Sequence, residues 1–126
     1  MKFEIEFDSD LDLRIVRILS AITYEELAGL ASVEEAQATH VMWFIEPGAL
    51  GELSIEELKR LLAIRRSFLL GKAGGQTLVV ADDPSEAMLM KWYKSYADEK
   101  LAGQVQLHMC ESIDSGKALL RSAAAE

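Results

Sequence analysis

The fold is decided by one stretch of the chain, Gly74-Gly75-Gln76-Thr77-Leu78-Val79-Val80-Ala81-Asp82-Asp83-Pro84. Its apolar run, Thr77 to Ala81, has the length of a strand, is rich in β-branched residues and shows no polar alternation. That pattern is typical of a strand covered on both faces in the middle of a parallel sheet. A helix start follows, with Asp83 as the cap, Pro84 at the first helical position and Glu86 closing a capping box.

The same strand-then-helix unit recurs on both sides of this stretch. Further strands are expected at Phe3–Phe7, Leu11–Leu19, His40–Ile45 and Gln104–Met109, and further helices after caps at Thr23, Ser54 and Ser112. The order β-β-α-β-α-β-α-β-α predicts a single α/β domain over residues 1–126. We expect an opening hairpin and a mostly parallel central sheet of about five strands with right-handed crossovers.

Several local details stay open or depend on alternation alone. In Leu11–Leu19 the apolar alternation shifts after Ile15, which indicates either a bulge at Ile15–Val16 or a strand buried on both faces. The segment Ser32–Thr39 is either a further capped turn of helix or a loop. Alternating Phe3, Ile5 and Phe7 predict a strand with one buried face. A loop is expected at Asp98–Gly103.

Composition excludes several classes of function. The chain has 126 residues and a formal net charge of −8, and an acidic protein repels nucleic acid and anionic membrane surfaces. A single cysteine, Cys110, excludes an internal disulfide and a multi-cysteine metal site. Acidic Glu4 and Glu6 stand where a signal peptide would be apolar, so we expect a cytoplasmic protein.

A resemblance to a known fold rests on patterns that span most of the chain. They are Leu19–Leu27, Val41–Ile45 with Leu53–Leu58, Gln76–Ala81, and Val105–Met109 with Ala118–Leu120. Together these resemble the STAS fold, named for sulfate transporters and anti-sigma-factor antagonists, and in particular its small stand-alone bacterial members. The resemblance implies a non-catalytic module for protein interaction or regulation.

One segment departs from the phosphorylated members of that family. In those antagonists, a strand like Val41–Ile45 ends in an Asp, followed by a Ser or Thr that a partner kinase phosphorylates. Here no hydroxyl follows until Ser54, which is explained as a helix cap. We therefore expect a docking surface without a phosphoacceptor, formed by Glu46, Pro47, Gly48, Ala49, Leu50, Gly51 and Ser54. The partner would be another protein or a second copy, paired through an edge strand such as Gln104–Met109 or an exposed helix face.

A second hypothesis comes from the similarity of this architecture to the lipid-binding CRAL-TRIO domains. Those domains are longer and have extra helices that enclose the lipid. In this chain an apolar pocket would lie between the sheet and Met88, Trp92, Tyr93 and Tyr96, although aromatic residues at helical spacing more often pack in the core.

The sequence gives little support for a catalytic site or a metal site. The carboxyl ends of the strands would collect Ser20, Thr23, Glu46, Asp82, Asp83, Glu111 and Ser112. Carboxylates there could bind Mg²⁺, but helix caps and solvated turns explain them better. His40 and His108 lack companions at metal-ligand spacing, and no Gly-x-Ser-x-Gly elbow is present. Residues Gly71–Gly75 precede a strand, where a phosphate loop would not lie. We therefore expect no enzyme, cofactor or metal site.

Overall fold

The fold has the expected class and the expected sequence of strands and helices along the chain. The computed structural model describes residues 2–34, 38–70, 75–100 and 106–125. The sheet order is β1-β2-β3-β4-β5, formed by β1 (Phe3–Asp8), β2 (Leu13–Ile18), β3 (His40–Ile45), β4 (Gln76–Ala81) and β5 (Gln106–Cys110). β1 and β2 form an antiparallel hairpin and every other pair is parallel. The predicted α/β class with an opening hairpin is confirmed.

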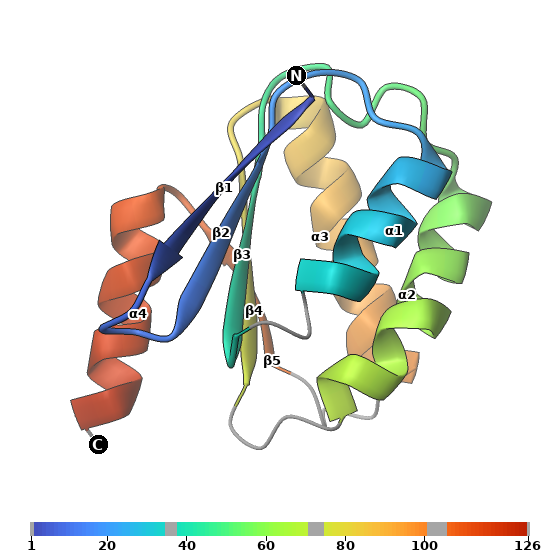
Figure 1. Cartoon of the computed structure of the whole chain (residues 1–126). Coiled ribbons are helices and arrows are strands. Elements are labelled where there is room, and N and C mark those ends of the chain that lie inside the picture. Colours follow the sequence, from blue (N-terminus) through green and yellow to red (C-terminus); the bar gives the residue numbers. More distant parts are fainter. Residues whose placement is uncertain (1, 35–37, 71–74, 101–105, 126) are drawn as a thin grey trace.

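The helices divide unequally between the two faces of the sheet (Figure 1). They are α1 (Tyr24–Glu34), α2 (Ile55–Leu70), α3 (Pro84–Lys100) and α4 (Ile113–Ala125). Helices α1, α2 and α3 cover one face, here called the three-helix face, and α4 covers the other, the α4 face. Right-handed crossovers between strands that follow one another in the same direction must place all three connecting helices together. Helix α4 makes no crossover, so the opposite face is open to it.

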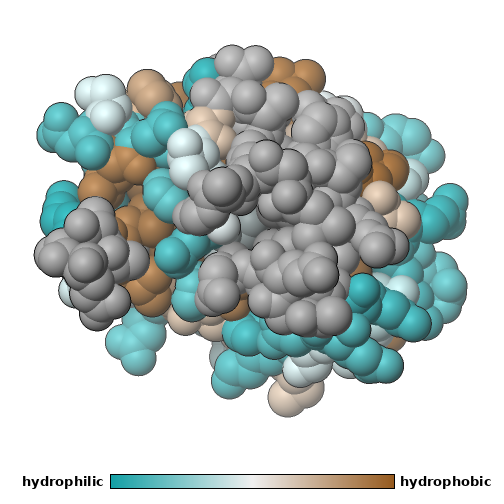
Figure 2. Space-filling model, turned by 90° about the horizontal axis from the view of Figure 1, so that it is seen from below, coloured by the Kyte–Doolittle hydropathy of each residue, from teal (hydrophilic) through white to brown (hydrophobic). Residues whose placement is uncertain are grey.

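Side-chain alternation along the strands feeds two separate cores. On β3, Val41, Trp43 and Ile45 belong to the large cluster beneath α1, α2 and α3. The smaller cluster on the α4 face contains Leu13, Ile15, Met42, Leu78, Val80 and Leu120. Gly116 lets α4 approach the sheet, because a Cβ there would overlap the Met42 methyl group. Seen from below, apolar side chains reach the surface on the side where α4 lies (Figure 2).

The hairpin answers one open alternative and corrects one expectation. The pairing of β1 with β2 is continuous through Ile15 and Val16, so there is no bulge and β2 is a strand buried on both faces, shorter than Leu11–Leu19. The buried face expected for β1 is wrong at its ends, where Phe3 is 39% and Phe7 51% exposed. β1 is the edge strand of the sheet, and of its three apolar residues Ile5 is the one that packs against the large cluster.

The predicted helix starts are confirmed by their capping bonds. The N–H of Glu26 donates to Thr23 Oγ1 at 3.2 Å, that of Glu57 to Ser54 Oγ at 3.1 Å, that of Glu86 to Asp83 Oδ2 at 3.2 Å and that of Ser115 to Ser112 Oγ at 3.0 Å.

Other boundaries differ or lie partly outside the described residues. Helix α3 continues to Lys100, so the loop expected from Asp98 starts too early. Ser32 and Glu34 are helical, which settles the first part of Ser32–Thr39. Ala38 and Thr39 are bend residues outside the helix, whereas residues 35–37, 71–74 and 101–105 lie outside the described part, and with them the middle of Ser32–Thr39, most of Gly71–Gly75 and the start of Gln104–Met109.

Candidate functional site

A buried carboxylate on α3 organises the loop that follows β3. Glu86 is 7% exposed, and its two oxygens accept hydrogen bonds from two backbone N–H groups of that loop. Oε1 accepts from Gly48 at 3.0 Å and Oε2 from Leu50 at 2.8 Å. An ionised acceptor makes such bonds shorter and stronger than neutral ones. The loop is therefore held in one conformation from the protein interior.

This role of Glu86 corrects the expected capping box. Asp83 alone caps α3, accepting from the N–H groups of Ser85 and Glu86. The Glu86 side chain reaches away from the helix start because it lies on the buried side of α3, in line with Met90, Tyr93 and Ala97. Its partners lie 36 and 38 residues earlier in the chain.

The loop backbone is fixed further by its own hydrogen bonds. Ile22 donates to Ala49 O at 3.1 Å, Ala49 to Glu46 O at 3.0 Å, and Gly51 to Gly48 O at 3.2 Å. Gly48 has a φ of 89°, a conformation that only glycine adopts without strain. The segment is thus a turn whose backbone is hydrogen-bonded within itself, to Ile22 and to the Glu86 side chain.

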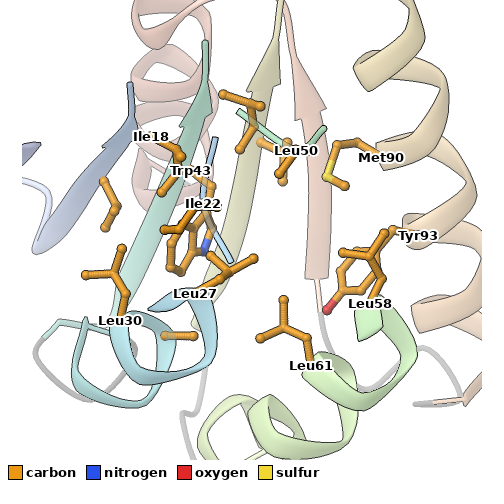
Figure 3. Packing of buried hydrophobic residues seen from close by; sticks show 14 of the residues in the cluster. Ile18, Ile22, Leu27, Leu30, Trp43, Leu50, Leu58, Leu61, Met90 and Tyr93 are labelled. Carbon is orange, nitrogen blue, oxygen red and sulfur yellow. The ribbon is translucent and has the colours of Figure 1, made fainter. Parts of the chain in front are cut away.

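The seven residues expected to form the docking surface divide into two groups. Pro47, Gly48, Gly51 and Ser54 are exposed and Glu46 is half-buried. Ala49 is 0% and Leu50 5% exposed, so these two side chains are corrected from surface to core. Both are apolar, and Leu50 packs in the large cluster close to Met90 (Figure 3). They anchor the loop and leave its tip exposed.

An ion pair lies beside the start of α1. Lys2 Nζ donates to Glu26 Oε1 at 2.9 Å, and the same oxygen accepts from the Thr23 N–H at 3.1 Å. The hydrogen bond from Lys2, followed by that from the Thr23 backbone, lowers the pKa of Glu26 to about 2. The same hydrogen bond raises the pKa of Lys2. The carboxylate is thus ionised at neutral pH.

The three-helix face also encloses a small apolar cavity of about 40 Å³. It is lined by Leu27, Trp43, Ile45, Leu50, Leu58, Leu61, Val79, Met90 and Tyr93, most of which are visible around it in Figure 3. A cavity of about 150 Å³ is needed to hold a ligand such as benzene. In this conformation the cavity accommodates no acyl chain.

The residues expected to line an apolar pocket are dispersed. Only Tyr93 borders the cavity, while Met88 is 73% exposed. Trp92 and Tyr96 are half-buried and stack on each other, with ring centroids 5.5 Å apart. The buried stripe runs instead through Glu86, Met90, Tyr93 and Ala97. The spacing i, i+4, i+7, i+11 is that of one helix face, but the glutamate at the first of these positions conceals the stripe in a search for apolar residues.

Of the seven polar residues expected at the strand ends, three border one groove and the other four do not. Thr23, Asp83 and Ser112 are helix caps. Asp82, Glu111 and Ser112 border an open groove of about 430 Å³ on the α4 face, together with Glu6, Arg17, Phe44, Ile113, Asp114 and Lys117. Within the described residues, no three His, Cys, Asp or Glu side chains are placed to hold a metal ion.

His40 makes a hydrogen bond to the backbone of the sheet, and desolvation shifts the pKa values of His108 and Cys110. His40 Nδ1 accepts a hydrogen bond from the Gln76 N–H at 3.1 Å, at the start of β4. Desolvation lowers the pKa of His108, and it raises the pKa of the Cys110 thiol. A thiol with a raised pKa is a poor nucleophile.

Comparison of the chain with protein-family models, curated proteins and solved structures found no match. In the part of the chain that the structure describes, no helix is both long and apolar enough to span a membrane. The geometry itself establishes a small α/β protein with a five-stranded mixed sheet, a hairpin followed by parallel strands.

Proposed function

We propose that this protein is a non-catalytic interaction module of the STAS type, which binds a protein partner through the loop Glu46–Gly51 and the start of α2 at Ser54. The observation that supports it is the pair of bonds from the buried Glu86 carboxylate to Gly48 and Leu50. A loop that is already fixed loses little conformational entropy when it docks. The module would thus present one preformed surface.

The chemistry of the exposed tip fits a protein surface. Pro47, Gly48 and Gly51 carry no long side chains, so a partner can approach the backbone closely. Next to them, Ile55 is 50% exposed and lies beside the exposed carboxylates of Glu52 and Glu56. An apolar side chain framed by acids favours a partner that offers an apolar pocket with basic residues at its rim.

Ser54 serves this surface as a cap. Its Oγ accepts from the Glu57 N–H at 3.1 Å, and Glu57 Oε1 accepts from the Ser54 N–H at 3.0 Å, a reciprocal capping box. The serine thus fixes the start of α2 next to the loop. We propose that recognition does not require its phosphorylation.

The test is affinity capture from an extract of the source organism, using a double variant of the loop rim, Pro47→Lys with Glu52→Lys. Both side chains are exposed, so the fold is retained while the local charge rises. The matched control, Ser9→Lys with Asp10→Lys, adds the same charge at the exposed β1–β2 turn. We expect only the loop variant to lose its partner.

Equal loss in both variants, or in neither, would contradict the proposal. Circular dichroism of both variants checks that each is folded. Ala49→Asp is not a suitable test, because Ala49 is 0% exposed and a buried unpaired carboxylate would unfold the loop.

The runner-up function is binding of a small apolar ligand between the sheet and α1, α2 and α3. The observation in its favour is the predominantly apolar lining of the cavity. Its volume of about 40 Å³ requires the helices to separate before a ligand enters, which places this function second. Native mass spectrometry after incubation with lipid extracts discriminates between them, since a retained lipid mass supports the runner-up. The same spectrum reports self-association.

A further inference from the structure

The α4 face leaves an open groove that no role described so far uses. Helix α4 crosses only part of its face, and the groove of about 430 Å³ lies between its first turn and the hairpin strands. That volume falls within the range of about 300–1,000 Å³ typical of small-molecule sites. No residue of the loop Glu46–Gly51 lines the groove, so the following inference does not rest on the proposed function.

Arg17 is one of the residues that line this groove. Its guanidinium carbon lies 5.3 Å from the centroid of the Phe44 ring, a cation–π arrangement that holds the planar group in place. Its Nε is buried and has no hydrogen-bond partner among the described residues. The nearest carboxylate oxygen, Glu6 Oε1, is 3.7 Å away, beyond hydrogen-bonding distance. A buried donor without an acceptor requires an explanation, and a bound oxyanion supplies one.

The other charged residues of the lining are mostly acidic. Asp82, Glu111 and Asp114 border the groove and are all exposed. Lys117, the second cation of the lining, is paired with Asp8 Oδ2 at 3.1 Å. The lining therefore combines one guanidinium, whose Nε has no hydrogen-bond acceptor among the described residues, with four carboxylates, Glu6 included, and with the apolar Phe44 and Ile113.

We propose that this groove binds a small molecule of the amino-acid class, with a carboxylate at one end, an aliphatic chain, and ammonium groups at the other positions. The carboxylate binds the planar donors of Arg17, which match its geometry. The ammonium groups face Asp82, Glu111 and Asp114, and the chain lies against Phe44 and Ile113. The excess of acids over bases in the lining favours a dibasic ligand such as L-lysine.

The test is isothermal titration of the wild-type protein with three probes. L-Lysine carries every group that the groove recognises, cadaverine lacks only the carboxylate, and L-norleucine lacks only the side-chain ammonium. We expect saturable binding of L-lysine in the millimolar range or tighter. Binding of cadaverine and of L-norleucine should each be weaker by about tenfold or more, since each leaves charged groups without a partner.

Two arginine variants locate the site. Arg17→Met keeps the aliphatic stem and removes the donors, and we expect it to weaken L-lysine binding by about tenfold or more while leaving the weak cadaverine binding unchanged. Arg121→Met removes an exposed arginine near the end of α4 and should have no effect.

The proposal is overturned if L-lysine shows no saturable binding, if cadaverine binds as tightly as L-lysine, or if Arg17→Met retains wild-type affinity. The comparison among the three probes uses only wild-type protein, so it stands even if a variant fails to fold.

Discussion

The two faces of the sheet differ in how completely they are covered. On the three-helix face, α1, α2 and α3 enclose a large apolar cluster, and its one buried charge, Glu86, has both oxygens bonded. On the α4 face, one helix covers a smaller cluster and leaves a charged groove beside it, where Arg17 Nε has no hydrogen-bond partner among the described residues. The polar group buried on the three-helix face is thus hydrogen-bonded, whereas on the α4 face Arg17 Nε is buried without a hydrogen bond among the described residues.

The difference follows from the handedness of the chain. Strands added one after another in the same direction, with right-handed crossovers, must place every connecting helix on one side. Only the helix after the last strand can cover the opposite side. A fold with this strand order therefore leaves half of one face uncovered unless the chain adds further elements.

The largest expected effect tests whether the two cores differ in rigidity. Leu58 on the three-helix face and Leu120 on the α4 face are 2% and 3% exposed. We expect Leu58→Ala to lower the free energy of unfolding by about 4 kcal/mol, because the new space joins the existing cavity between packed helices. Leu120→Ala should cost about 2 kcal/mol, since α4 has no neighbouring helix and can shift to fill the space. Urea denaturation measures both, and equal losses would contradict the comparison.

A second pair tests the two charges that distinguish the faces. Glu86→Ala should lower the free energy of unfolding by about 2–3 kcal/mol, because it removes two charge-assisted bonds and leaves the N–H groups of Gly48 and Leu50 unpaired. Arg17→Met should change it by no more than about 0.5 kcal/mol, because that guanidinium makes no hydrogen bond at Nε.

Glu99→Ala, at an exposed position of α3, is the control for Glu86→Ala. A loss for Arg17→Met as large as that for Glu86→Ala would show that Arg17 is structural, and would remove the reason for assigning its donors to a ligand.

Local signals in the sequence predicted much of this fold. The uninterrupted run from Thr77 to Ala81 identified a central strand, and cap residues such as Ser54 and Ser112 identified helix starts. These features depend on neighbours within a few residues, so sequence alone carries them. The α/β class, with its opening hairpin and mostly parallel sheet, then followed from the alternation of strands and helices along the chain.

The candidate sites depend on contacts between residues far apart in the sequence, which a local sequence pattern cannot predict. Glu86 was expected to bond three residues back, and instead bonds a loop 36–38 residues earlier. Met88 and Met90 both fit an apolar stripe on α3. Met90 is the buried one of the two, because the sheet packs against its side of the helix. Likewise, the exposure of Phe7 results from the edge position of β1. Long-range packing decided each of these outcomes.

The helix caps should be insensitive to the difference between the faces. Ser54 caps α2 on the three-helix face and Ser112 caps α4 on the other, each through a reciprocal pair of bonds with the residue three positions later. Ser54→Ala and Ser112→Ala should each cost about 1 kcal/mol in thermal or urea unfolding. Ser95→Ala, at an exposed position within α3, serves as the control. Unequal cap effects would show that the α4 face also weakens local structure.

The smallest effect concerns the surface carboxylates in acid. The pKa of Glu26 is lowered from 4.5 to about 2 by its bonds with Lys2 and Thr23, and Lys117 lowers the pKa of Asp8 at the α4 face. In the unfolded chain Glu26 binds its proton near pH 4.5, so in the window between these values the unfolded state holds more protons than the folded one. Stability from this carboxylate is present above that window and is lost as the pH falls through it.

Glu26→Gln should therefore flatten the fall of the urea midpoint between pH 4.5 and 2, and Asp8→Asn should flatten it less. Added salt should reduce both differences, because these pairs are accessible to solvent. A steeper fall in Glu26→Gln than in the wild type would contradict the assigned direction of the pKa.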